Sequence, residues 1–408
     1  MKKHVLVPKY VRDFSCIGPK CEDDCCYGWQ VFIDKKTYKK YKCIKDKSIK
    51  SIIDKSVTRN RKSSSEHNYG KIKMNESKVC PFQDENKLCS IHKTLGWEYL
   101  SYTCYTYPRV NNFVLGKYEK SALMSCPEIA RLVLLNLNKM EFDEVEDVEK
   151  YNDVLWKQLG KGKFRELQQY FWDLRVFSID LLQNRNFSIE KRLILLGLFL
   201  RKVNQYVLDK KTDAIPQLII SYNSEINENF KDLFDEVPTE YNIQLQMMKI
   251  ISDTRVKFNL HDTTFKECLD EFYEGMGYND TNENNTQNYI DNYIDNYNKY
   301  YEPYMKEHEY MLENYLVNYV FTNLFPVGSD YSVFDEYCLC ILHYSLIKTY
   351  LIGISGFYKK LDEKLVVKLI FSMCRCFEHG NQVLEYVFAV FKSSNKMNME
   401  YMALLIKN

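Results

Sequence analysis

The chain has 408 residues, 14 cysteines and a formal net charge of +1, so it lacks the strong basic excess typical of nucleic-acid-binding proteins. Its length exceeds what one ordinary hydrophobic core serves, and we therefore expect two domains. Charge is unevenly divided. Residues 1–130 carry 25 lysines and arginines against 14 acidic residues, and the remainder carries 31 against 41. We predict a basic, cysteine-rich domain over residues 1–135 and an acidic domain over residues 136–408.

The first residues, MKKHVLVPKYVRDF, contain no apolar segment of the kind a secretory signal needs. We therefore expect a cytoplasmic protein whose thiols stay reduced. Under that expectation, closely spaced cysteines indicate metal ligation, and disulfide bonds are the minor alternative.

Eight cysteines form two groups of four on either side of Ser48–Lys78, a segment that we expect to be a loop. The first group has C-x4-C-x3-C-C spacing and the second has C-x8-C-x14-C-x21-C spacing. The groups are Cys16, Cys21, Cys25 and Cys26, then Cys80, Cys89, Cys104 and Cys126. Four thiolates suffice for one [4Fe–4S] cluster or one all-thiolate zinc site. Zinc ribbons usually present C-x2-C knuckles, and none occurs among these eight.

The other cysteines are predicted to be non-ligands. Cys43 and Cys268 stand alone. The C-x-C pairs 338/340 and 374/376 lie in apolar helical runs, where residues two apart do not face each other, so we assign them to the core.

Beyond residue 141 the apolar residues recur every three to four positions, which predicts a mainly α-helical bundle. Helices are expected over 142–155, 164–177, 216–233, 239–257, 302–324, 333–354, 362–378 and 381–392, and one from an N-cap at Ser188 to Val203. A polar segment near 278–290 is expected to be a flexible insert. The apolar run from Cys338 to Ser355 contains His343 and Lys348, so we predict a buried helix and no transmembrane segment.

Residues around the cysteines carry a more specific signal. Residues 80–92 (CPFQDENKLCSIH) and 103–109 (TCYTYPR) resemble the zinc- or iron-chelating CxxCxxCC family, although the first gaps between cysteines are longer here. Residues 21–26 (CEDDCC) and 125–131 (SCPEIAR), with 312–319 (LENYLVNY) far downstream, are similar to flagellin lysine N-methylases. The resemblance extends over nearly the whole chain.

The resemblance implies S-adenosylmethionine-dependent methylation of lysine side chains on flagellin, with a [4Fe–4S] cluster held by the cysteines. Zinc is the alternative metal. The radical-SAM spacing C-x3-C-x2-C is not completed, because Gly28 stands at its third position. No glycine-rich strand-to-helix turn of the usual methyltransferase kind is visible either. The methyl donor is therefore expected to bind in another way.

A lysine ε-amine has a reference pKa of about 10.4 and must lose a proton before it attacks a sulfonium methyl. Polar side chains flanking the cysteines are the candidates for this chemistry. We predict catalytic roles for Glu22, Asp23, Tyr105 and Tyr107, since carboxylates accept protons and tyrosine rings hold a sulfonium by cation–π contact. The alternative for Glu22 and Asp23 is a solvated turn.

Donor binding is predicted for Arg109, which is suited to a carboxylate, and for Asp34 and Glu128. The alternatives are structural: Asp34 caps a helix, and Arg109 bridges to an acidic residue. Asn314 and Asn318 lie four residues apart on one helix face, as a buried amide pair or as substrate ligands.

Two other kinds of function stay open on the sequence alone. One is a non-catalytic zinc- or iron-binding structural or maturation protein, and the other is a redox or metal sensor. The sequence predicts no oligomeric state.

Overall fold

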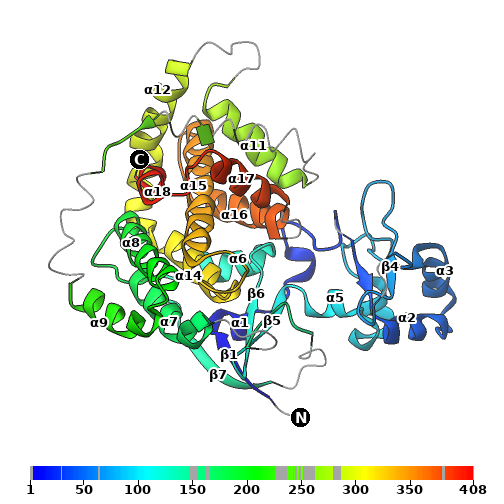
Figure 1. Cartoon of the computed structure of the whole chain (residues 1–408). Helices are drawn as coiled ribbons and strands as arrows, with labels where there is room; N and C mark the ends of the chain where they lie inside the picture. The colour runs from blue at the N-terminus through cyan, green and yellow to red at the C-terminus, as the bar shows by residue number, and fades with distance from the viewer. Residues whose placement is uncertain are drawn as a thin grey trace.

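In this computed structural model the chain folds into a large helix-rich part and a smaller part beside it (Figure 1). Each part is organised around its own hydrophobic cluster. The structure describes residues 3–28, 30–62, 65–147, 154–160, 166–225, 237–241, 243, 246, 247, 250, 262–278, 286–378 and 382–407. The larger cluster joins a five-stranded sheet to most of the helices, and we call this part the body. The smaller cluster lies within residues 31–100, and we call this part the small lobe.

The body's sheet has the strand order β7-β1-β6-β5-β8. Its strands are β1 (Lys3–Pro8), β5 (Arg109–Val114), β6 (Lys117–Ala122), β7 (Phe142–Asp147) and β8 (Lys157–Leu159). β1 pairs with β6 in parallel and with β7 antiparallel, in a register that sets Val5 opposite both Tyr118 and Val145. The prediction of a helix from residue 142 is wrong at its start, because Phe142 and Val145 lie in a strand. Residues 148–153 lie outside the described residues.

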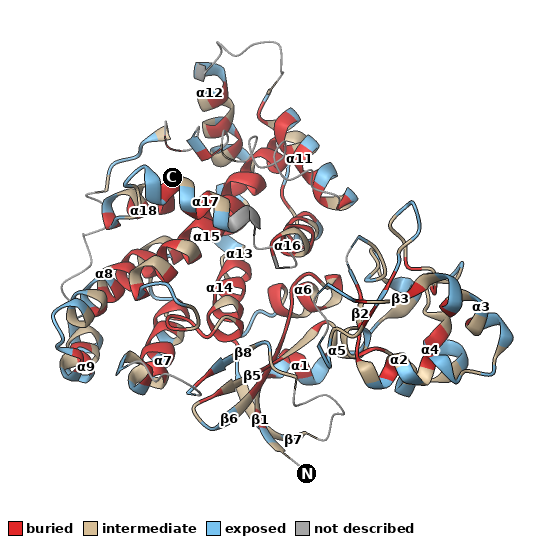
Figure 2. Cartoon of the chain, turned by 45° about the vertical axis from the view of Figure 1, so that its right-hand side comes forward, coloured by how far each residue is buried: buried red, intermediate tan, exposed pale blue. Residues whose placement is uncertain are grey.

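Helices cover this sheet and surround α15 (Val333–Tyr358), which is buried along most of its length (Figure 2). The α-helices of the body are α1 (Lys9–Asp13), α6 (Pro127–Leu134), α7 (Phe171–Leu182), α8 (Ile189–Leu208), α9 (Ile215–Glu225), α11 (Thr263–Gly275), α12 (Thr286–Asn296), α13 (Glu302–His308), α14 (Tyr310–Thr322), α16 (Glu363–Glu378), α17 (Gln382–Ser393) and α18 (Met399–Ile406). Shorter helical turns are η3 (Glu166–Tyr170), η4 (Thr212–Ala214) and η5 (Tyr297–Tyr301), the last a π-helical turn.

The small lobe pairs a three-stranded sheet, β2-β4-β3, with short helices. Its elements are β2 (Phe32–Ile33), α2 (Lys35–Lys42), α3 (Lys47–Ser56), β3 (Val57–Arg59), β4 (Gly70–Ile72), α4 (Ser90–Leu95) and η2 (Trp97–Tyr99). Ser48–Lys78 is therefore not one loop, since α3, β3 and β4 occupy much of it. Ile49 and Ile53, one turn apart on α3, are buried in the lobe's core, where β-strand and helix faces meet.

The boundary between the two hydrophobic clusters does not fall at residue 135, where the sequence predicted a domain boundary. β1, α1, β5, β6 and α6 all precede that boundary, yet their apolar residues belong to the same cluster as the helices of the body. The mainly α class is confirmed for the C-terminal part, whereas the N-terminal part contains strands that the periodicity did not indicate.

Most helices expected beyond residue 160 are present, and the helix expected over 239–257 lies mostly outside the described residues. Ser188 caps α8, as predicted, by accepting a hydrogen bond from the backbone of Lys191. α15 is long and apolar enough to cross a membrane. However, 94% of its apolar stretch of 18 residues is buried inside the protein, as expected for a core helix. The predicted insert near 278–290 ends in α12, and residues 279–285 lie outside the described part.

Candidate functional site

The eight predicted ligand cysteines lie where the small lobe meets the body. Cys16 and Cys21 flank the short turn η1 (Gly18–Lys20), and Cys104 lies in α5 (Tyr102–Thr106). Cys89 and Cys126 occupy the N-cap positions of α4 and α6. None of the 14 cysteines, all of which the structure describes, forms a disulfide.

Three of these thiols are in direct contact. Cys26 shares side-chain hydrogen bonds with Cys25 and Cys80, which lower the pKa of those two thiols and raise the pKa of Cys26. The backbone N–H of Cys80 also donates to the carbonyl of Cys26 at 2.8 Å. The first and second cysteine groups therefore meet, although Cys80 lies 54 positions after Cys26 in the sequence.

Burial raises the pKa of the Cys126 thiol to about 12, and it also raises the pKa of Cys89. Hydrogen bonds from backbone N–H groups at the starts of α6 and α4 lower the pKa of Cys126 and of Cys89, respectively, and so oppose the effect of burial. Within the described residues, no three histidine, cysteine or carboxylate side chains are arranged to share one metal ion. The soft donor set suits an iron–sulfur or zinc centre, but the thiols would have to close around it, so we derive no chemical step through a metal.

Glu22 and Glu128 bind the same arginine. Arg131 Nη2 lies 2.5 Å from Glu22, and Nη1 of the same guanidinium pairs with Glu128, three residues earlier on α6. This arrangement ties the loop after Cys21 to the helix that begins at Cys126. The two carboxylates hold the junction together, and their predicted roles in catalysis and donor binding stay predictions.

Asp23 is held by groups from far along the chain. Its Oδ2 lies 2.7 Å from Nη1 of Arg375 on α16 and accepts a hydrogen bond from Thr264 at 3.0 Å. The same Nη1 lies 3.1 Å from Asp262, and Nη2 donates to the carbonyl of Ser125 at 3.4 Å. Arg375 thus joins the cysteine-rich loops to two elements of the body.

Asp34 caps a helix, the structural alternative named for it. It accepts hydrogen bonds from the backbone of Thr37 at 2.8 Å and of Tyr102 at 3.3 Å, and so connects α2 to α5.

The other three predicted residues are aromatic or contact aromatic rings. The Tyr107 hydroxyl donates to Ser125 Oγ at 3.3 Å. The remaining two predicted residues make ring contacts: Arg109 lies 4.8 Å from the centre of the Phe14 ring, and Tyr105 lies 5.6 Å from Trp97.

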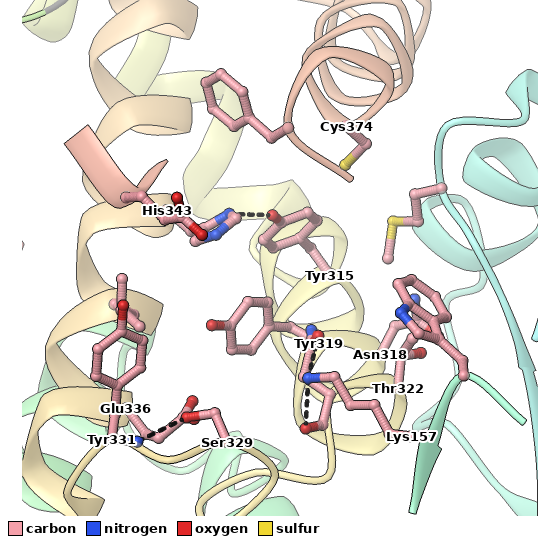
Figure 3. A pocket seen from close by; sticks show the side chains of 16 residues that line it. Lys157, Tyr315, Asn318, Tyr319, Thr322, Ser329, Tyr331, Glu336, His343 and Cys374 are labelled. Carbon is pink, nitrogen blue, oxygen red and sulfur yellow. Dashed lines mark hydrogen bonds between the residues drawn. The ribbon is translucent and has the colours of Figure 1, made fainter. Parts of the chain in front are cut away.

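A cavity of about 210 Å³ opens between α14, α15 and the residues before β8 (Figure 3). Its mouth carries exposed side chains and its floor carries buried ones. The exposed residues are Trp156, Tyr331 and Glu385. The buried residues are Met124, Tyr315, Asn318, Thr322, Glu336, His343, Cys374 and Phe377. Aromatic rings therefore frame a site that also holds polar groups and charges of both signs.

Three charged side chains line this cavity: Glu385 is exposed at its mouth, and Lys157 and Glu336 lie deeper. Lys157 Nζ donates to the carbonyl of Asn323 at 3.1 Å and to its Oδ1 at 3.2 Å. The side chain is partly buried, which lowers the pKa of Lys157, while the nearby Glu336 carboxylate opposes that shift. Glu336 is 5% exposed and accepts a hydrogen bond from Ser329. A lysine and a carboxylate, both largely shielded from water, thus line the same cavity.

His343 and Tyr315 form a buried pair on the cavity wall. The Tyr315 hydroxyl and Nδ1 of His343 are 3.0 Å apart, and the Tyr319 ring lies 5.0 Å from the imidazole (Figure 3). Burial lowers the pKa of His343 to about 4, so the ring is neutral at pH 7.

The cavity and the cysteine groups share two stretches of chain. Met124 lines the cavity, and Cys126 is two residues further along. Cys374 lines the cavity, and the next residue, Arg375, binds Asp23 in the cysteine-rich loop. Both stretches therefore run directly from the cysteine-rich loops to the cavity wall.

The sequence identified little of this cavity. It singled out Asn318, which lines the cavity and accepts a hydrogen bond from Tyr10 at 2.5 Å. Asn314, predicted with it, does not line the cavity and donates to the carbonyl of Asn136. Lys157 and Glu336 were not predicted. The sequence feature that could have indicated the cavity was His343, an ionisable residue in an apolar helix. In the sequence it served only as an argument against a membrane span.

Comparisons with known proteins agree on one family. Residues 175–405, more than half of the chain, match the family model described as "FliB lysine N-methylase C-terminal domain". This span contains α14, α15 and α16, which supply most of the cavity's walls. The chain belongs to this family.

Two of the curated relatives carry the enzyme name that the family model also carries. Proteins named "Lysine-N-methylase" from Salmonella choleraesuis (strain SC-B67) and Salmonella typhimurium (strain LT2) are each 29% identical over 257 residues, 63% of this chain. That match spans 59% of the length of each relative. "Flagellar biosynthetic protein FliU" of Salmonella muenchen is 34% identical over 160 residues, which is 39% of this chain and 93% of that protein. No solved structure matches the chain.

Proposed function

We propose that this chain is a protein-lysine N-methyltransferase that uses S-adenosylmethionine and acts on flagellin. The observation that carries the proposal is the family match over residues 175–405, which includes the helices around the aromatic cavity. The names of two relatives, "Lysine-N-methylase" and "Flagellar biosynthetic protein FliU", support the reaction and a flagellar substrate.

The proposed step is a nucleophilic substitution. The lone pair of a neutral lysine ε-amine forms a bond to the sulfonium methyl. The carbon–sulfur bond breaks, and its electron pair stays on sulfur to give S-adenosylhomocysteine. The methylated nitrogen then releases one proton. In-line geometry and exclusion of water are what the protein contributes to such a step.

The proposal is tested with purified full-length chain, S-adenosylmethionine and flagellin, incubated anaerobically and analysed by mass spectrometry. We expect mass increases of whole methyl groups, located on lysines. A matched reaction with acetylated flagellin, whose lysines are blocked, should give none. Unchanged flagellin in the presence of chain that has its full metal content would reject the methyltransferase assignment.

We also propose that the eight cysteines hold an iron–sulfur centre. The support is the contact between the two groups through Cys25, Cys26 and Cys80, together with the soft donor set. When bound, such a centre would supply open iron coordination or electron transfer. As isolated anaerobically, the protein should be brown and contain iron. Colourless protein that contains zinc would favour the non-catalytic metal-binding alternative.

The paired change Cys25→Ser and Cys26→Ser separates these roles, with Cys43→Ser as the matched control in the small lobe. Cys43 is an exposed thiol at the end of α2. We expect the double variant to lose iron and methylation together and the control to keep both. Full methylation by an iron-free double variant would remove the centre from the reaction.

A further inference from the structure

We propose that the cavity between α14, α15 and β8 binds the methyl donor, with Lys157 and Glu336 holding the two charges of its amino-acid group; this rests on the proposed function. The donor carries an aromatic base, ribose hydroxyls, a sulfonium, a carboxylate and an ammonium. A site for it must present aromatic surface together with one group of each charge. The cavity presents both, as described above.

The aromatic part of the cavity suits the adenosine and the sulfonium. Trp156 and Tyr331 are exposed at the mouth, and Tyr315 and Tyr319 line the wall. Tyrosine and tryptophan rings attract cations to their faces and stack on flat bases. Polar side chains between these rings give such a ligand its orientation.

The charged groups favour the donor over the acceptor. Lys157 has three N–H bonds, and in the described part of the chain two of them donate to Asn323. A ligand carboxylate would complete its hydrogen bonding, while the ammonium of a substrate lysine would be repelled. The Glu336 carboxylate, buried beside it, is the matching partner for the donor's ammonium.

A buried hydroxyl supports a ligand independently of these charges. Thr322 is 5% exposed and lines the cavity, and its Oγ1 has no hydrogen-bond partner among the described residues. A buried hydroxyl without a hydrogen-bond partner is energetically unfavourable. A polar ligand in this cavity would remove that cost.

The second large cavity of the described residues, about 360 Å³, fits the donor less well. Three carboxylates and three lysines line it: Glu190, Glu302, Glu309, Lys306, Lys348 and Lys407. Glu309 already pairs with Arg192, and Lys407 already donates to the carbonyl of Val237. Its buried lysine, Lys348, already donates to the carbonyl of Ile406 at 3.0 Å and lies 3.6 Å from Glu190. Lys348 is therefore a matched control: a buried lysine in a cavity that is not the proposed site.

The test measures equilibrium binding by calorimetry, which needs no turnover. The probes are S-adenosylhomocysteine and 5′-methylthioadenosine, which keeps the adenosine but lacks the amino-acid group. Lys157→Met and Glu336→Gln should each weaken binding of S-adenosylhomocysteine about tenfold or more and leave binding of methylthioadenosine within about twofold. Lys348→Met should change neither affinity. Circular dichroism confirms that each variant is folded.

The outcomes separate this inference from the proposed function. If the wild type methylates lysine but both cavity variants bind S-adenosylhomocysteine as tightly as the wild type, the donor lies elsewhere and the inference fails alone. Equal losses for the two probes would also overturn the assignment of Lys157 and Glu336. If S-adenosylhomocysteine binding follows the pattern above but no lysine is methylated, the site stands and the proposed function fails.

Discussion

Nη1 of Arg375 lies 2.7 Å from Oδ2 of Asp23, so a helix near the end of the chain is fastened to the loop between Cys21 and Cys25. The ion pair is mostly shielded from water, with 12% of the arginine side chain and 17% of the aspartate side chain exposed. Cys374, the residue before Arg375, lines the proposed donor cavity. Through this pair the body sets the position of the cysteine-rich loops beside the cavity.

Replacing Arg375 should be costly. Arg375→Met leaves Asp23 and Asp262 facing each other without a cation, and removing one partner of a buried ion pair costs about 3–5 kcal/mol. Urea unfolding should show the loss. Arg12→Met is the matched control, because Arg12 pairs with Asp143 at the surface and its loss should cost less than about 1 kcal/mol. Equal losses in the two variants would mean that Arg375 does not fasten the junction.

Thr322→Val should raise stability and lower donor affinity at the same time. Valine has the same shape and removes a buried hydroxyl that has no partner in the described structure, so the free energy of unfolding should rise by up to about 1 kcal/mol. Affinity for S-adenosylhomocysteine should fall severalfold, because the ligand loses one hydrogen bond. A variant that is less stable with unchanged affinity would show that the hydroxyl has a structural role.

His343 should make stability depend on pH between about 4 and 6.5. Burial lowers its pKa to about 4 in the folded protein, so the unfolded chain takes up a proton first as the pH falls. The histidine's contribution is therefore fully present above pH 6.5 and is lost progressively toward pH 4, by about 3 kcal/mol in total. Urea unfolding at pH 7 and pH 4.5 should show a smaller difference for His343→Gln than for the wild type. His4→Gln, at an exposed position of β1, should retain the wild-type difference.

The Arg175–Glu119 pair should be essential to the attachment of α7 to the sheet. Both side chains are at most 3% exposed, and Arg175 Nη1 lies 2.8 Å from Glu119. Arg175→Met should cost about 3–5 kcal/mol, since it strands a buried carboxylate. Adding Glu119→Gln to that variant should recover part of the loss in urea unfolding. A double variant that is less stable than Arg175→Met would contradict this account.

Features set by neighbours in the sequence were predicted well. The apolar spacing of 164–177 and 333–354 indicated α7 and α15, and the hydroxyl of Ser188 indicated the start of α8. A helix makes its hydrogen bonds within a few residues, so its signal is local. The short strand β7 was mistaken for a helix because its pairing partner, β1, lies more than 130 residues earlier in the chain.

The predicted site residues were also limited by partners that lie far away in the sequence. The sequence marked Asp23 and Glu22 as candidates because they flank cysteines, but their partners, Arg375 and Arg131, come from distant helices. Spacing alone could not choose between a charge free for chemistry and one that is held in an ion pair. Asp34 was the exception, because its capping partner Thr37 is three residues away.

The sequence by itself determined the helical body, the crowding of soft thiols before residue 130, and the resemblance to lysine methylases, because each depends on residue identity and short spacing. Only the tertiary structure brought Cys26 against Cys80, joined the N-terminal strands to the body, and assembled a cavity from Met124, Lys157, Glu336 and Cys374. Those contacts depend on chain segments tens to hundreds of residues apart, and the burial that gives them their chemistry exists only after the segments have packed.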